Sequence, residues 1–252
     1  MARKIVKLNR VPQSLDVTLA TNDFVNVELY AKSTEFKNTA YSLRWNRFRG
    51  VKTFRIMLPI PVDEVEIVAR EKGTGDESVV GIKNIERKHL ETHSRYLWNK
   101  SPYLKEFLNH IYDFCERATN IPAGKYNSNS GEIRINYKEN LYNKIGGKEV
   151  LSTTPCRIDA NSKEIEVAKS KFQRYSVSGR IALLLHEFSH CYINKNMCDE
   201  FEADKNCALI YLGLGFPRVD LLNTWIMCYE NADNEGNRQR LEKFFQYVDS
   251  IG

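Results

Sequence analysis

Hydrophobic and polar residues alternate along the first third of the chain, in short runs rich in Val, Ile, Phe and Tyr. Turn-forming segments such as TND, RFRG and KGTGDES separate the runs at intervals of about ten residues. This spacing is typical of short antiparallel strands. Residues 1–92 are therefore expected to form a β-rich domain resembling a small sandwich or barrel. The runs are KIVKLN, DVTLA, FVNVELY, YSLRW, KTFRIMLPI, EVEIVA and VVGIKNI.

The period of the apolar residues becomes helical after residue 92. A first helix is predicted within 101–119. Two strand regions follow, at 132–137 and 156–168, and the second contains ANSK as a turn. Further helices are predicted at 178–194, 198–213, 217–230 and 236–250. The pattern as a whole predicts an α+β chain of two domains, 1–92 and 93–252.

Composition and charge indicate the cellular compartment of the protein more than they indicate its function. The chain has 252 residues and a net charge of +5, which is too mild to indicate a nucleic-acid partner by itself. The first residues carry positive charge without an apolar segment, and IALLL is too short to span a bilayer. We therefore expect a protein made in a cytoplasm, with no membrane partner. The six cysteines include no CxxC pair and are expected to be reduced thiols.

Candidate chemistry lies in the helix predicted at 178–194. His186 and His190 are one helical turn apart, and Glu187 lies beside them, while Ile181, Leu184 and their neighbours form a separate apolar face. Two imidazoles at this spacing can bind one zinc ion. Glu187 points away from that ion but can reach a water bound to it. In this HExxH arrangement the histidines are metal ligands and the glutamate is the general base.

A third ligand is expected from the next helix, because a catalytic zinc site needs three protein ligands and an open position. Glu200 and Asp204 are four residues apart and share one face of that helix. If the two helices form a hairpin, Glu200 lies level with His190, and Asp204 can accept a hydrogen bond from a ligand histidine. Glu202 is the alternative third ligand, and it requires a different rotation of the hairpin.

HEFSH followed by EFEAD resembles the gluzincin zinc metallopeptidases, which carry HExxH followed by ExxxD. The continuation through LGLGFP is similar to the soluble peptidase domains of the CAAX-prenyl-protease type and the ImmA/IrrE type. The resemblance covers residues 100–252, and its diagnostic part is 181–217. It implies a zincin-like fold with an active-site helix, zinc bound by His186, His190 and Glu200, and Glu187 as the catalytic base. It assigns no group that stabilises the transition state, since those relatives often carry a late histidine near a C-terminal arginine, and the matching segment NEGNRQRLEKF has Arg238 and Arg240 but no histidine.

The first functional hypothesis is a zinc metalloendopeptidase acting on a protein or peptide. The strand at 163–168 or 132–137 would be the cleft edge, where an extended substrate adds to the sheet. Tyr192, Tyr211 and Tyr175 are candidate oxyanion donors. The second hypothesis is a structural or assembly protein, such as a virion component of a tailed bacteriophage, that carries a gluzincin fold and assembles through the β-rich domain.

One basic and aromatic stretch, RWNRFRGVKTFR at 44–55, raises the question of a further partner. In a hairpin, we expect alternation to place the aromatic side chains inward and the charged ones outward, as on an ordinary solvated face. An acidic protein partner is the first alternative. A nucleic acid, whose phosphates and bases such basic and aromatic residues can contact, is the less favoured second alternative.

Overall fold

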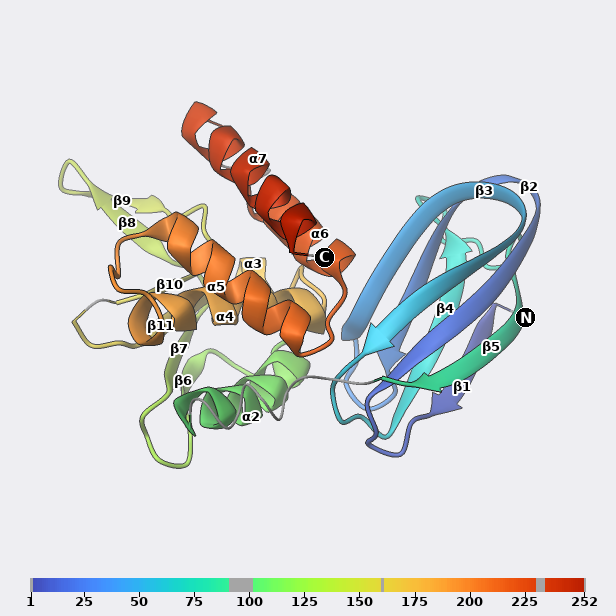
Figure 1. The fold of residues 1–252 in the computed structure, drawn as a ribbon, viewed down its shortest axis with the longest axis horizontal. Coiled ribbons are helices and arrows are strands. Elements are labelled where there is room, and N and C mark those ends of the chain that lie inside the picture. The colour runs from blue at the N-terminus through green and yellow to red at the C-terminus, as the bar shows by residue number, and fades with distance from the viewer. Residues whose placement is uncertain (1, 91–101, 160, 230–233, 252) are drawn as a thin grey trace. The chain divides into compact units, whose positions relative to one another are not determined.

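The structure is a computed structural model and describes residues 2–90, 102–159, 161–229 and 234–251 (Figure 1). Its contacts divide the chain into two compact units, Met1–His93 and Ser94–Gly252. The boundary predicted after residue 92 falls within 91–101, outside the described residues. Strands make up the first unit, and helices and short strands the second, so the expectation of a mixed α+β chain is confirmed.

The first unit is a five-stranded antiparallel sheet whose longest strand, β2, pairs with three others. One edge of β2 pairs with β3, while β5 and β4 share its other edge. Side chains that alternate along β2, among them Leu15, Val17, Val27 and Leu29, are fully buried and form the core. The strands are β1 (Arg3–Lys7), β2 (Gln13–Ser33), β3 (Ala40–Leu58), β4 (Glu64–Glu71) and β5 (Gly81–His89).

The prediction of strands about ten residues apart was wrong for β2 and β3, which are 21 and 19 residues long. The TND and RFRG segments lie inside these strands and do not end them. The pairing of β2 with β3 shifts register between Thr21 and Val25, and Gly50, opposite Thr21, has a φ of +84°. A bulge of this kind absorbs extra residues in one strand without breaking the pair. The turn-forming segments TND and RFRG therefore mark a β-bulge within this strand pair and not the end of a strand.

The second unit contains a four-stranded sheet in the order β10-β11-β7-β6, with β11 parallel to β7 and the other pairs antiparallel. A separate hairpin of β8 and β9 turns at Gly146 and Gly147, which both have positive φ. The strands are β6 (Gly124–Asn127), β7 (Arg134–Lys138), β8 (Tyr142–Ile145), β9 (Lys148–Leu151), β10 (Cys156–Ile158) and β11 (Ile165–Ala168). In the strand order of the four-stranded sheet, β10 lies at one edge. The sequence pattern had not predicted the strands β6, β8 and β9.

Each of three helices in this unit begins at a polar side chain that accepts a hydrogen bond from the first turn. Ser176, Asp199 and Asn234 accept from the backbone N–H of Gly179, Glu202 and Asn237 in turn. The helices are α2 (Pro102–Arg117), α3 (Lys169–Phe172), α4 (Val177–Tyr192), α5 (Glu200–Gly213), α6 (Arg218–Tyr229) and α7 (Glu235–Ser250). The five predicted helices are confirmed to within two residues at each end, while the four-residue helix α3 had not been predicted.

Helix α4 is the centre of the second unit, and it packs against α2, α5, α6 and β10. Ile181, Leu184 and Phe188 are fully buried, and Phe188 stacks on Phe107 of α2 with ring centroids 4.4 Å apart. The buried Arg180 guanidinium donates to the carbonyls of Cys115, Phe172 and Gln173. This helix is therefore held from several sides, which makes it a rigid platform for the side chains of its remaining face.

All six cysteines are free, as expected. Within the described ranges, no helix is both long enough and apolar enough to cross a membrane.

Candidate metal centre

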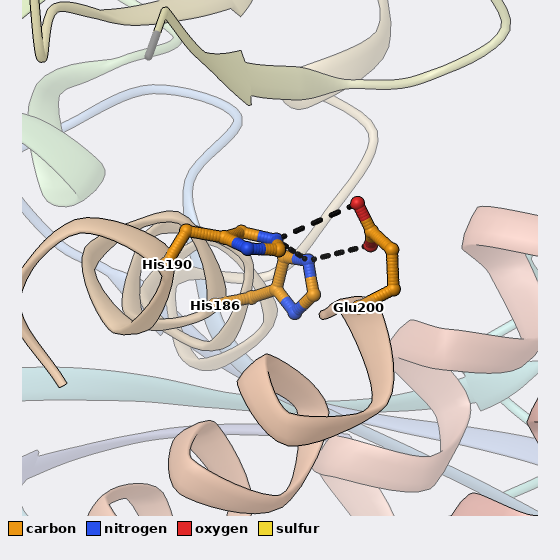
Figure 2. A group of neighbouring side chains, drawn as sticks. All are labelled: His186, His190 and Glu200. Atoms are coloured by element: carbon orange, nitrogen blue, oxygen red, sulfur yellow. Dashed lines mark hydrogen bonds and ion pairs between the residues drawn. The ribbon is translucent and has the colours of Figure 1, made fainter. Parts of the chain in front are cut away.

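Helices α4 and α5 bring His186, His190 and Glu200 into one group, in which one ligand atom from each residue lies within 4.8 Å of the others. Figure 2 shows both imidazoles projecting from α4 toward the carboxylate at the start of α5. Nε2 of His186 is 3.0 Å from Nε2 of His190 and 3.4 Å from Oε2 of Glu200. Nε2 of His190 is 3.6 Å from Oε1 of Glu200.

These separations fit a small tetrahedral ion. Ligand atoms about 2.0–2.1 Å from a tetrahedral zinc lie about 3.3 Å from one another. The two Nε2 atoms are 3.0 Å apart, and each lies near a different oxygen of Glu200, at 3.4 Å for Oε2 and 3.6 Å for Oε1. Two nitrogens and one oxygen are also a ligand set that zinc accepts. The donor geometry is therefore compatible with zinc.

The other nitrogen of each ring points away from the group, toward an oxygen. Nδ1 of His190 is 2.7 Å from the carbonyl oxygen of Met197 and can donate to it. Nδ1 of His186 is 3.0 Å from Oδ1 of Asp204, a close contact whose angle falls short of a hydrogen bond. Oxygens at these positions favour a proton on Nδ1, which leaves the lone pair of Nε2 facing the centre of the group.

Asp204 is fully buried and is held by two side chains besides His186. Trp225 Nε1 donates to Oδ1 at 3.0 Å, and the Arg240 guanidinium donates to both carboxylate oxygens at 2.6 and 2.7 Å. Arg240 also lies 2.7 Å from Oε2 of Glu200 through Nη1. One guanidinium on α7 therefore fixes both carboxylates of α5. The sequence showed Arg240 without assigning it a place, and Trp225 had not been singled out.

The charges around the histidines favour a cation between them. Burial lowers the pKa of His186, but the carboxylates of Asp204 and Glu200 outweigh burial and raise that pKa to about 10. Contacts with His186, and next with His190, hold the pKa of Glu200 well below its usual range. The carboxylates thus favour positive charge between the two imidazole rings, whether a proton or a metal ion supplies it.

Glu187 lines the same cavity as the three ligand atoms. The cavity has a volume of about 410 Å³. Glu187 is buried, and burial raises the pKa of its carboxyl group, a shift that suits a proton acceptor. The Cys156 thiol lies 3.5 Å from Glu187 Oε1 and can donate to it, a contact that the sequence did not indicate. The cavity also exposes Ile158, Leu183, Met197, Trp225, Cys228 and Tyr229.

The strand that borders the cavity is β10, which contributes Cys156, Arg157 and Ile158. The expectation that 163–168 or 132–137 forms the cleft edge was wrong. These segments correspond to β11 and β7, and both are interior strands whose edges are already paired. Only three residues form β10, so its alternation was too short to identify it as an edge.

The three tyrosines proposed as oxyanion donors lie elsewhere among the described residues. Tyr211 stacks on Phe216, Tyr192 stacks on Phe188, and Tyr175 borders a different, small cavity. Tyr229 is the tyrosine that lines the cavity of the candidate metal group. The alternative third ligand, Glu202, is also not in that group.

Comparisons with protein-family models, curated proteins and solved structures found no match for this chain.

Proposed function

We propose that the protein is a zinc-dependent metallopeptidase and that residues 93–252 form a gluzincin-type catalytic domain. The observation that carries the proposal is the group of His186, His190 and Glu200, in which the two Nε2 atoms are 3.0 Å apart and each lies 3.4 or 3.6 Å from a carboxylate oxygen of Glu200. Glu187 in the same cavity supplies the acid–base group that such a peptidase needs.

His186, His190 and Glu200 would hold the ion, and Asp204 and Arg240 would keep the ligands in place. When bound, zinc would polarise the scissile carbonyl and lower the pKa of a coordinated water to about 7. Tyr229 and Arg240 both line the cavity, so either side chain is a candidate for hydrogen bonding to the carbonyl oxygen. The contact between Arg240 and the carboxylates makes Tyr229 the freer of the two donors.

Glu187 would move the proton. Its carboxylate accepts a proton from the attacking water as the carbon–oxygen bond forms, and then donates it to the nitrogen of the leaving amine. The Cys156 thiol, 3.5 Å away, would orient the carboxylate while leaving it basic, because a thiol is a weak hydrogen-bond donor. The proton ends on the amine product, and Glu187 returns to its starting state.

The substrate would bind as an extended strand along β10. The free edge of this strand leaves backbone N–H and C=O groups available for pairing, and its residues line the cavity. A peptide in this position would pass the ligand group with its carbonyl facing the cavity. This placement supports an endopeptidase.

Peptide hydrolysis with matched variants tests the proposal. The zinc-loaded wild type is expected to cleave an unfolded protein substrate, and chelation is expected to stop cleavage. Glu187→Gln should lower kcat by about 10²–10⁴ while the protein still binds zinc, because only the proton transfer is lost. Cleavage by Glu187→Gln at the wild-type rate would contradict the assigned mechanism.

The assembly hypothesis stays a prediction, since a virion-associated or other structural protein can keep an intact site. Sedimentation of the full chain separates the two cases. A monomer is expected for a free peptidase, and a ring or higher-order particle for an assembly component.

A further inference from the structure

Two large aromatic side chains of the first unit are exposed. Phe24 is 67% exposed and Trp45 is 58% exposed. The expectation that aromatic residues of the 44–55 stretch point inward is confirmed for Phe48 and Phe54, which are buried with ring centroids 5.7 Å apart. It was wrong for Trp45, because Trp45 has the same phase along β3 as the outward Arg47.

Each exposed ring, and the half-buried ring of Tyr30, has a cation over it. The Arg47 guanidinium lies 5.9 Å from the centre of the Phe24 ring, and the Lys72 ammonium lies 4.6 Å from that of Trp45. The Arg70 guanidinium lies 4.9 Å from the centre of the Tyr30 ring. These distances are within the range of cation–π attraction.

Strand register places these groups on one face of the sheet. Trp45 of β3 lies opposite Glu28 of β2, and Glu28 lies opposite Arg70 of β4. Arg47 lies opposite Asn26, whose carbonyl accepts the backbone N–H of Lys72. Directly opposed residues of antiparallel strands point to the same side. The aromatic–cation face thus spans β3, β2, β4 and the residue after β4, and Phe24 joins it through its contact with Arg47. It consists of Phe24, Tyr30, Trp45, Arg47, Arg70 and Lys72.

The charge of this face favours an anionic partner. The carboxylate of Glu28 within it is bound by Arg70 at 3.1 Å and by the Tyr30 hydroxyl at 2.8 Å. Arg47 and Lys72 add positive charge at its exposed side. The net charge of the wider region is also positive, since residues 1–92 carry 16 Lys and Arg against 12 Asp and Glu. Phosphate groups are therefore attracted to this face.

We propose that the aromatic–cation face binds single-stranded nucleic acid. Bases stack on the exposed rings of Trp45 and Phe24, and phosphates contact Arg47 and Lys72. An acidic polypeptide would satisfy the cations but offers no row of planar groups to cover the rings. Duplex DNA keeps its bases stacked inside the helix and away from the rings. This binding does not depend on the metal centre, and for residues 44–55 it favours the nucleic-acid alternative over a plain solvated face.

Fluorescence anisotropy of the full chain with a labelled oligothymidylate of about 15 nucleotides tests this binding. The expected Kd at physiological salt is about 1–100 µM, and it should fall as the salt is lowered, because counterions are released on binding. A duplex of the same length and polyglutamate are the comparison ligands, and both should bind more weakly. Equal binding of polyglutamate, or no binding of the oligonucleotide at low salt, would overturn the proposal.

Two variants separate stacking from charge. Trp45→Ala should weaken oligonucleotide binding by about 5–100-fold, whereas Tyr142→Ala, at an exposed tyrosine on the β8–β9 hairpin, should leave it unchanged. Arg47→Gln should weaken binding and reduce its salt dependence. Circular dichroism of each variant confirms folding. Unchanged affinity in a folded Trp45→Ala protein would show that the face is not the binding site.

Discussion

The candidate metal centre and the aromatic–cation face both combine charged and aromatic side chains, but they do so in opposite surroundings. In the metal centre, Asp204 is fully buried and bound by Arg240 and Trp225. On the aromatic–cation face, Trp45 is 58% exposed and its cationic neighbour is a flexible lysine. A buried charge depends on all its partners, whereas an exposed pair is screened by water. Single substitutions should therefore have large effects on stability in the first region and small ones in the second.

The largest loss of stability is expected at Asp204. Asp204→Ala removes the carboxylate that faces His186 and binds Arg240, and leaves the partly buried guanidinium with fewer acceptors. We expect the free energy of unfolding of the metal-free protein to fall by about 3–5 kcal/mol, as for a broken buried ion pair. Urea denaturation measures the change. Trp45→Ala is the comparison on the other face, and a loss of the same size there would remove the contrast between the two regions.

Removal of Arg240 should have the next largest effect. Arg240→Met keeps the volume of the side chain but leaves Asp204 and Glu200 without their shared donor. The expected loss is about 1.5–3 kcal/mol, typical of a hydrogen bond to a charged group. The control is Arg218→Met, which breaks a contact of 3.3 Å to the exposed Asp249 and should change stability by less than about 1 kcal/mol. Equal losses in the two variants would show that Arg240 does not organise the site.

A smaller, pH-dependent effect is expected in the first unit. Asp16 is bound by Arg55 at 2.8 Å and by Lys88, and these contacts lower its pKa from 3.8 to about 2. Because the folded-state pKa lies below the unfolded one, the contribution is present above about pH 4 and disappears toward about pH 2. After allowance for the exposed Arg55 and Lys88 side chains, we expect about 1 kcal/mol.

Denaturation of Asp16→Asn at about pH 6 and at about pH 2 measures this contribution, relative to the wild type. The variant should be less stable than the wild type at the higher pH, and the difference should shrink at the lower pH. Asp63→Asn is the control, since Asp63 is 69% exposed and its nearest cation is 3.6 Å away. If the difference in stability between Asp16→Asn and the wild type grew as the pH fell, the predicted direction of the pH dependence would be wrong.

The central helix and its motif could be predicted because they depend on local sequence. Apolar residues at helical spacing identified α4, and His186, Glu187 and His190 lie together on it. Glu200 and Asp204 could be added because one short turn connects α4 to α5. The proximity of these residues followed from helical geometry, while the presence of zinc remains a proposal.

The remaining parts of the site depend on contacts between distant segments. Arg240 is 36 residues from Asp204, and Cys156 is 31 residues from Glu187. No local period indicates such pairs. The long strands of the first unit were missed for a different reason, because residues at the Thr21–Val25 bulge have the same composition as a turn. Whether such residues form a turn or a bulge depends on which strands pair in the folded protein.

Measurement of zinc in the purified protein, after exchange into metal-free buffer with added zinc, is the sharpest test of the proposed metal centre. We expect one zinc ion per chain for the wild type and for Glu187→Gln, and loss of that ion in His186→Ala and in Glu200→Ala. Circular dichroism verifies that these variants are folded. Absence of bound zinc in the wild type, or full retention in a folded His186→Ala protein, would contradict the proposed metal centre.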